Sequence, residues 1–222
     1  MPISVNDAIY SRHSKRSFLS APVQKTVIKK ILMNAANAPS SKNTQPWGVA
    51  VLQGELMQTL SRQMCQKFDE GVMDGEDYCY SKDPMPDHFK ARARACGYAL
   101  FDLKGIERTD KAQRVAHNKE NFVFFNAPIV LIIHMDQDSE RGNFLDCGCF
   151  IQNILLGAVG YGLGACPQFS ICAFSDTIRG VLKLPESRMV VCGISMGYPD
   201  DHIVNTFVPD RLPLDKFVTW HD

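Results

Sequence analysis

The chain has 222 residues, of which 45% are hydrophobic and 22% charged, and its formal net charge is zero. This is the composition of a globular protein long enough to bury a substantial core. The balanced charge argues against nucleic-acid binding, for which a protein of this size usually carries a basic excess. Residues 1–10 lack the apolar segment of a signal peptide, and the longest apolar stretches are too short to span a bilayer. We therefore expect a cytoplasmic protein without a membrane partner.

Apolar residues at helical spacing predict three helices in the first third of the chain, over 4–11, 24–37 and 55–68. Ser4 with Asp7 three positions later resembles the capping box that opens a helix. Pro39 stops the second pattern. The short apolar run 47–52 predicts a buried strand between the second and third helices.

The region 70–108 is the least regular part of the chain, and only its second half, 87–103, has a helical pattern. Further helices are predicted from Thr109 or Asp110 to about 122, over 143–159, and over 175–182. The helix 143–159 is apolar around most of its circumference, which is typical of a helix in a core or a subunit interface. Strands are predicted over 128–135 and 189–196, with a strand or loop at 163–167. This irregular order favours an α+β class and one domain.

Eight cysteines invite a disulfide, redox or metal interpretation. The chain contains no Cys-x-x-Cys pair, and Cys147 and Cys149 point to different faces of a helix. Most of the cysteines lie among apolar neighbours, where a free cysteine behaves as a small hydrophobe. The histidines show no ligand spacing, so we expect no metal site. An alternative function is that of a redox protein that uses its thiols or a bound metal. Such a protein would be colourless.

Two polar segments carry the functional signal. The stretch Arg12-His13-Ser14-Lys15-Arg16-Ser17-Phe18 collects cations and small donors that suit a phosphate. The stretch Pro39-Ser40-Ser41-Lys42-Asn43-Thr44-Gln45-Pro46-Trp47 offers amides and hydroxyls to a flat heterocycle. Taken separately, the first could be a solvated basic patch at a helix end and the second a surface turn. Together they indicate a phosphorylated ring cofactor.

The pair resembles the nitroreductase family of FMN flavoproteins, in which Arg-His-Ser-x-[Lys/Arg] precedes Pro-Ser-Ser-x-Asn-x-Gln-Pro-Trp by one helix. Three later segments resemble the family's Gly-Leu-Gly-x-x-Pro segment, its last core strand with a Gly-[Tyr/His]-Pro end, and its closing Arg-x-Pro, at 162–168, 190–199 and 211–214. The matches span nearly the whole chain in the correct order. Within the family, the chain looks most like the 4-nitrobenzoate or nitrobenzene reductases.

The resemblance implies a nitroreductase-like fold with a central mixed sheet flanked by helices, in an intertwined homodimer. Residues 1–222 would form one FMN-binding domain with a variable, pocket-forming insert around 70–108. Several aromatic residues of that insert, including Tyr78 and Tyr80, are candidates for a pocket that stacks aromatic substrates.

The resemblance also assigns cofactor contacts. Arg12, Ser14 and Arg211 would hold the FMN phosphate, and Arg12 or His13 would touch the pyrimidine side of the flavin. Arg16 takes the family's cationic position near flavin N1 and O2, with Lys15 as the competing candidate. The partner subunit would contribute Pro39, Ser40, Ser41, Asn43 and Gln45. The chain would pass the ring edge near N5 at Pro167, Gln168 and Phe169. Phe169 would contact the ring through its backbone, because the family often has Glu at that position.

The implied reaction is reduction of FMN by NADH or NADPH as a transient hydride donor, followed by reduction of a nitroaromatic acceptor to the nitroso and then the hydroxylamino compound. These two-electron steps would be ping-pong, and no side chain need act as catalytic acid or base. A cation near N1 and O2 would stabilise the charge that reduction places there. The alternatives on this scaffold are quinone or enone reduction, reductive dehalogenation and oxygen-dependent flavin breakdown. A non-catalytic FMN-binding protein is an alternative from another class.

Overall fold

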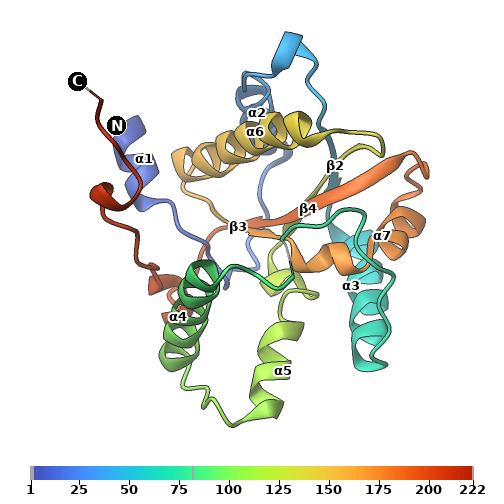
Figure 1. Cartoon of the computed structure of the whole chain (residues 1–222). Helices are drawn as coiled ribbons and strands as arrows, with labels where there is room; N and C mark the ends of the chain where they lie inside the picture. The colour runs from blue at the N-terminus through green and yellow to red at the C-terminus, as the bar shows by residue number, and fades with distance from the viewer. Residues whose placement is uncertain (1–2, 82, 222) are drawn as a thin grey trace.

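The computed structural model describes residues 3–81 and 83–221. A four-stranded sheet in the order β1-β2-β4-β3 forms its centre, built from β1 (Gly48–Leu52), β2 (Ile129–Asp136), β3 (Gly164–Gln168) and β4 (Arg188–Gly197) (Figure 1). Each of the three pairings is antiparallel. The α+β class is therefore confirmed, but the sheet of the described chain is antiparallel rather than mixed.

The two central strands carry the longest aliphatic runs. Ile129 to Ile133 of β2 are completely buried, and β4 is buried along nearly its whole length. Strands covered on both faces need apolar residues at consecutive positions rather than at alternate ones. The aliphatic run that predicts a strand at 128–135 thus also reflects its central position.

β1 lies at one edge of the sheet and pairs only with β2. Its single fully buried residue is Leu52, while Val51 is 46% exposed. The structure confirms a strand within the predicted range 47–52, but the prediction that this strand is buried is wrong. Strand order decides which strands have covered faces, and a short apolar run does not reveal it.

Helices cover both faces of the sheet. One face packs against α2 (Lys25–Ala35) and α6 (Arg141–Gly160), and the other against α3 (Gly54–Asp69) and α7 (Ser175–Leu182). The Trp47 ring stacks on Phe150 of α6 with centroids 4.7 Å apart, which joins the polar 39–47 segment to the first core. By length and composition α6 could cross a membrane, a criterion that core helices also meet. Here one side of α6, including Phe150 and Ile154, belongs to the core.

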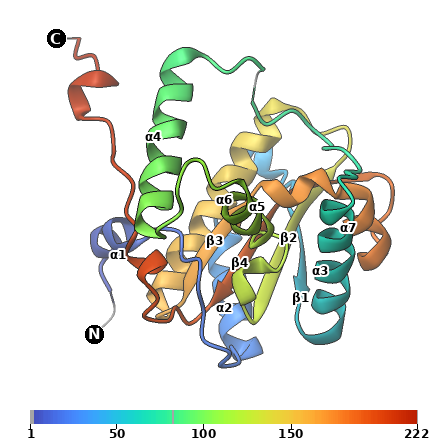
Figure 2. The ribbon, with the colours of Figure 1, turned by 90° about the horizontal axis from the view of Figure 1, so that it is seen from below.

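The remaining helices lie outside these layers. α1 (Val5–Ser11) begins after Ser4, whose hydroxyl accepts from the Asp7 amide as predicted. α4 (Asp87–Leu103) and α5 (Lys111–Lys119) project below the sheet in Figure 1, and in Figure 2, which shows the molecule from below, α5 overlaps the sheet. Asp110 caps α5. Short 3-10 turns complete the chain, at η1 (Ser41–Asn43), η2 (Phe124–Asn126), η3 (Ser170–Ala173), η4 (Ile203–Thr206) and η5 (Leu214–Lys216). In both views the chain after η4 passes α4 and leaves the body of the molecule.

Candidate active site

The cationic segment 12–17 runs beside the end of the sheet. The Lys15 amide donates to the Ala165 carbonyl of β3 over 3.1 Å, and Phe18 forms a β-bridge with Pro199. This close approach requires glycine at 164, because a Cβ there would lie 2.6 Å from Cγ of Lys15. The family-like Gly-Leu-Gly segment thus fixes the distance between β3 and the cationic segment.

Asn205 in η4 holds the same segment from the other side, and it is buried. Its Oδ1 accepts from the Arg16 amide over 2.8 Å, and its Nδ2 donates to the Ser17 carbonyl over 2.8 Å. Its backbone carbonyl accepts from Lys15 Nζ over 2.8 Å. These bonds direct Lys15 inward, where burial lowers its pKa, and leave Arg16 to face the adjacent cavity.

A small cavity of about 70 Å³ lies beside this segment and collects cations from both ends of the chain. Its lining comprises Arg12, His13, Ser14, Arg16, Cys96, Phe207, Pro209 and Arg211. None of the ion pairs formed by the described residues includes one of these arginines. Three guanidinium groups without a lining carboxylate make a site that fits a phosphate dianion. The structure therefore brings Arg12, Ser14, Arg16 and Arg211 together, and it places His13 with them.

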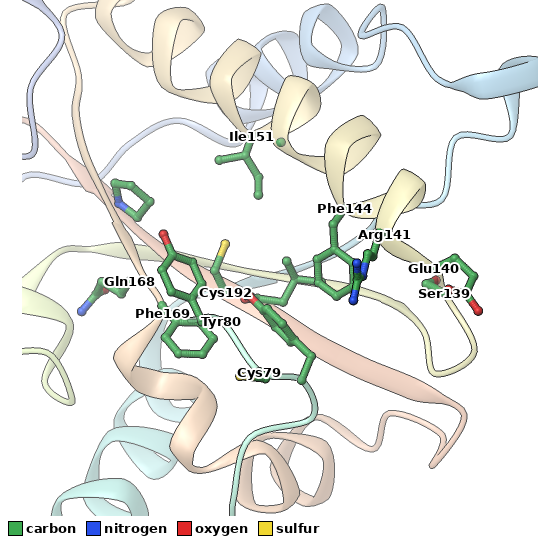
Figure 3. Close-up of a pocket in the computed structure, with 14 residues that line it drawn as sticks. Cys79, Tyr80, Ser139, Glu140, Arg141, Phe144, Ile151, Gln168, Phe169 and Cys192 are labelled. Atoms are coloured by element: carbon green, nitrogen blue, oxygen red, sulfur yellow. The ribbon is translucent and has the colours of Figure 1, made fainter. Parts of the chain in front are cut away.

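A larger cavity of about 880 Å³ opens between the end of β3, β4 and α6. Its aromatic lining comes from Tyr78, Tyr80, Phe144 and Phe169 (Figure 3). Pro167 and Gln168 also line it, so the three residues predicted to pass the flavin edge lie together. The Gln168 side chain, however, accepts from the Ser195 hydroxyl and donates to the Asn121 carbonyl over 2.9 Å. The side-chain amide of Gln168 is therefore engaged within the protein. Only the backbone of Gln168 is left to contact a ligand in this cavity.

The tyrosine wall of this cavity is fixed by a bulge in β4. Ile133 pairs with Cys192 and His134 with Val190, so Val191 is left without a partner on β2. The Tyr78 hydroxyl donates to the freed Val191 carbonyl over 2.7 Å, and Asp77 accepts from the Val190 amide over 2.7 Å. Bulges often reshape a sheet next to a functional site. At this bulge, the two hydrogen bonds attach the irregular segment that follows α3 to β4, which forms the floor of the cavity.

Two carboxylates, those of Asp77 and Asp74, make further contacts that hold that segment. Asp77 pairs with the buried Arg179 of α7 over 2.6 Å. Asp74 accepts from the amide and hydroxyl of Thr177 over 2.8 and 2.7 Å, and also from Lys67. Burial by itself raises the pKa of Asp74, but these hydrogen bonds outweigh it and leave the pKa lowered. These contacts hold the first half of the variable region in place, so that it forms a fixed wall of the larger cavity.

The polar loop 39–45 lies apart from both cavities. Its turn is closed by the Gln45 amide, which donates to Oγ of Ser40 over 3.0 Å. The Ser41 amide donates to the buried Asp146 of α6 over 3.2 Å. Lys42, Asn43 and Gln45 have positive φ values of 51°, 58° and 47°. Pro39, Ser41, Asn43 and Gln45 are exposed and Ser40 is half-buried, so the loop can contact another surface but does not join Arg12 within this chain.

Burial keeps the thiols of the core protonated. All eight cysteines, each in the described part of the chain, are free. Burial raises the pKa of Cys147 to about 12 and holds the pKa of Cys192 well above its ordinary value. Among the described residues, no group of three His, Cys, Asp or Glu side chains could hold a metal ion.

Several residues of the site carried no recognisable signal in the sequence. Cys96 on α4 reaches the cationic cavity, and Asn205 fixes its wall. Tyr78 and Tyr80 were visible only as members of an aromatic-rich region, and the structure places both at the larger cavity. Asn205 belongs to no motif, but it is a polar residue inside the apolar stretch 203–208, and this signal could have selected it.

Comparison with known proteins decides the family. The sequence model of the Nitroreductase family matches residues 9–198. This chain belongs to the nitroreductase family. It is 36% identical to a chloronitrobenzene nitroreductase of Comamonas testosteroni, with 99% of each chain covered. It is 34% identical to a 4-nitrobenzoate reductase of Pseudomonas putida, with 87% of this chain and 85% of that protein covered.

The fold comparison agrees. The crystal structure of the FMN and NADPH-dependent nitroreductase NfnB from Sphigopyxis sp. strain HMH superposes with a TM-score of 0.96 at 29% identity, over 99% of this chain and all of that one. The nitroreductase-like fold predicted from the motifs is therefore confirmed, and so is the resemblance to the branch of nitrobenzene and 4-nitrobenzoate reductases.

Proposed function

We propose that the protein is an FMN-dependent oxidoreductase that uses NADH or NADPH to reduce nitroaromatic compounds. The observation that carries the proposal is the convergence of Arg12, Arg16 and Arg211 on one cavity without a lining carboxylate. Such a cavity suits a phosphate, and the relatives are named as a chloronitrobenzene nitroreductase, over 99% of this chain, and a 4-nitrobenzoate reductase, over 87%. The aromatic lining of the larger cavity suits a flat acceptor.

Each group of residues then has a role. Arg12, Ser14 and Arg211 would hold the phosphate, and Arg16 would supply positive charge at flavin N1 and O2. Pro167, Gln168 and Phe169 would contact the ring edge through their backbone. FMN, when bound, accepts hydride from the nicotinamide and passes electrons to the nitro group.

Two titratable groups that line the larger cavity, Tyr78 and Cys192, are unsuited to acid–base catalysis at neutral pH. Burial raises the pKa of Tyr78 and that of Cys192, so both keep their protons. The Tyr78 proton is also engaged on the Val191 carbonyl. The role of Tyr78 is therefore to shape the cavity, and protons for the reduced product would come from solvent.

The functional unit would be a cytoplasmic homodimer. The exposed loop 39–45 reaches neither cavity of its own chain, so its predicted flavin contacts require a second copy. Eight free thiols are in keeping with a reducing compartment.

Flavin retention tests the phosphate assignment. The double variant Arg12→Ala with Arg211→Ala removes two charge-assisted contacts, and we expect purified protein to lose its bound FMN and its yellow colour. The exposed Arg62 of α3 provides the matched control, since Arg62→Ala removes a charge far from the cavity. Absorbance near the flavin band gives the occupancy. Unchanged occupancy in the double variant would contradict the assignment.

A further inference from the structure

His13 and Lys15 meet at one backbone carbonyl beside the cationic cavity. His13 Nε2 lies 3.0 Å from the Asn205 carbonyl oxygen and 2.7 Å from Lys15 Nζ, and Lys15 Nζ donates to the same oxygen over 2.8 Å. The other ring nitrogen, Nδ1, lies 2.9 Å from the Ser11 carbonyl oxygen. Both ring nitrogens are therefore engaged inside the protein, although His13 lines the cavity. His13 can act on a ligand there through its charge rather than through a hydrogen bond.

This arrangement accommodates one positive charge and not two. A carbonyl oxygen only accepts, so the contact with Ser11 places a proton on Nδ1 of His13. Without a proton, Nε2 accepts from the Lys15 ammonium group. With a proton on Nε2, two cations lie 2.7 Å apart and repel each other. Burial also lowers the pKa of Lys15, so a second charge is disfavoured further.

The carboxylates on the segments around the pair do not compensate a second charge. These segments carry Asp7, Asp200, Asp201 and Asp210. Asp7 and Asp200 each accept from a serine hydroxyl, over 2.6 and 2.5 Å, Asp201 is exposed, and Asp210 lines an adjacent cleft rather than this cavity. No ion pair among the described residues joins a carboxylate to His13 or Lys15. A second proton on the pair therefore requires an anion from a ligand.

The other titratable groups around the pair come from η4, β3 and α4. His202 before η4 is engaged locally, since its Nδ1 accepts from the Val204 amide over 3.1 Å. Cys166 of β3 is buried, and burial raises its pKa, so it keeps its proton. Cys96 of α4 lines the cavity and is exposed. Its thiol is the competing source of any pH dependence at this site.

We propose that FMN binding draws a second proton onto the pair formed by His13 and Lys15, so that cofactor binding is coupled to proton uptake. The inference rests on the proposed function and concerns the regulation of the same site. A phosphate dianion bound in the cavity would favour the doubly charged pair, because opposite charge nearby stabilises a cation. The proton comes from solvent. By linkage, the affinity for FMN then falls as the pH rises.

Fluorescence titration of the full chain, freed of flavin, tests the inference between about pH 7.5 and 9, where the phosphate itself is already a dianion. We expect the Kd for FMN to rise about threefold per pH unit, which corresponds to uptake of about half a proton. Riboflavin lacks the phosphate, so its Kd should change by less than about twofold over the whole range. Calorimetry in buffers of different ionisation enthalpy counts the protons directly.

Variants assign the proton to its group. His13→Gln keeps a hydrogen-bond donor but cannot take up the proton, so the rise in Kd should flatten to less than about 1.5-fold per pH unit. Cys96→Ser removes the competing thiol from the same cavity and should keep the full rise. His88→Gln replaces an exposed histidine of α4 whose ring contacts Phe89, and it should also keep the full rise.

The contrary outcomes are distinct. A Kd for FMN that does not change with pH, or equal changes for FMN and riboflavin, would overturn the inference and leave the proposed function intact. A rise that persists in His13→Gln, or that Cys96→Ser removes, would also overturn it. The proton count of the unmodified protein decides the question even where His13→Gln binds FMN too weakly to titrate. A protein that binds no FMN at any of these pH values would overturn both the inference and the proposed function.

Discussion

Asn205 shows how one buried polar side chain can determine the geometry of a binding site. It bonds the Arg16 amide, the Ser17 carbonyl and Lys15 Nζ, and its Nδ2 also donates to the Asp200 carbonyl over 3.1 Å. The cationic segment has no regular secondary structure of its own, so these bonds replace the ladder that a strand would have. The positions of Arg12 and Arg16 thus depend on a residue almost 190 positions away in the chain.

Asn205→Ala should therefore weaken both the fold and flavin binding. Removing the amide leaves the half-buried Arg16 N–H without its partner and leaves the Ser17 carbonyl only the longer bond of 3.4 Å from the Asp200 amide, which we expect to lower the free energy of unfolding by about 2 kcal/mol. Urea unfolding measures this change, and fluorescence titration measures the FMN affinity. Asn37→Ala is the matched control, since the exposed Asn37 bonds only local carbonyls of α2. Equal behaviour of the two variants would show that Asn205 does not position the segment.

The elements of the fold divide into those that local pattern determines and those that depend on neighbours. The long helices α3, α4 and α6 and the central strands were predictable within a few residues, because an amphipathic or fully apolar pattern specifies them locally. The edge position of β1, the antiparallel sheet and the β4 bulge at Val191 were not, because each is a property of strand pairing. Tyr78 was predicted only as a candidate for an aromatic pocket, and its exact place in the cavity wall depends on the same pairing, since its hydroxyl bonds the Val191 carbonyl at the bulge.

The site divides in the same way. Arg12, Ser14, Arg16 and Arg211 were predictable because they belong to motifs, and the structure gathers them in one cavity. Arg141 and Cys96 belong to no motif that we recognised, and only the packing of α6 and α4 brings them to cavities. The inward side chain of Gln168 also follows from tertiary structure, through its bond with Ser195 on the neighbouring strand.

The contact between β3 and the cationic segment can be tested with one methyl group. In Gly164→Ala the new Cβ would lie 2.6 Å from Cγ and 2.9 Å from Cβ of Lys15, so the segment must move away from β3. We expect a loss of about 2 kcal/mol in the free energy of unfolding and weaker FMN binding, because overpacking displaces Arg12 and Arg16. Thermal unfolding and flavin titration would measure the two effects.

Gly180→Ala on α7 provides the control, since nothing lies within 4 Å of the position of its Cβ. Alanine has the higher helix propensity, so this variant should be neutral or more stable by up to about 1 kcal/mol. If Gly164→Ala bound FMN as tightly as Gly180→Ala, the close approach of β3 would have no influence on the cofactor site.

The molecule as a whole presents apolar surface that a single chain leaves uncovered. Several large apolar side chains outside the core are more than 60% exposed, among them Val5, Tyr10, Met33, Leu145, Val208, Phe217 and Trp220. They lie on α1, α2 and α6 and on the C-terminal segment, residues 207–221, which leaves the body of the molecule in Figures 1 and 2. Where exposed side chains of this kind form a contiguous patch, they mark interaction sites in soluble proteins. The proposed homodimer would bury it and bring the loop 39–45 to the partner's cavities.

Replacing the apolar residues of the C-terminal segment should therefore separate the subunits. In the double variant Phe217→Glu with Trp220→Glu, two side chains that are 65% and 77% exposed in the single chain become charged, so burying them against a partner becomes unfavourable. We expect light scattering after size exclusion to give about half the molecular mass of the unmodified protein, together with loss of FMN, because the partner's loop is then absent. Leu56→Glu on α3, which is 47% exposed and distant from these elements, should leave the mass unchanged. A monomeric unmodified protein that retains FMN would contradict the proposed assembly, and a double variant that remains dimeric would show that the C-terminal segment does not hold the subunits together.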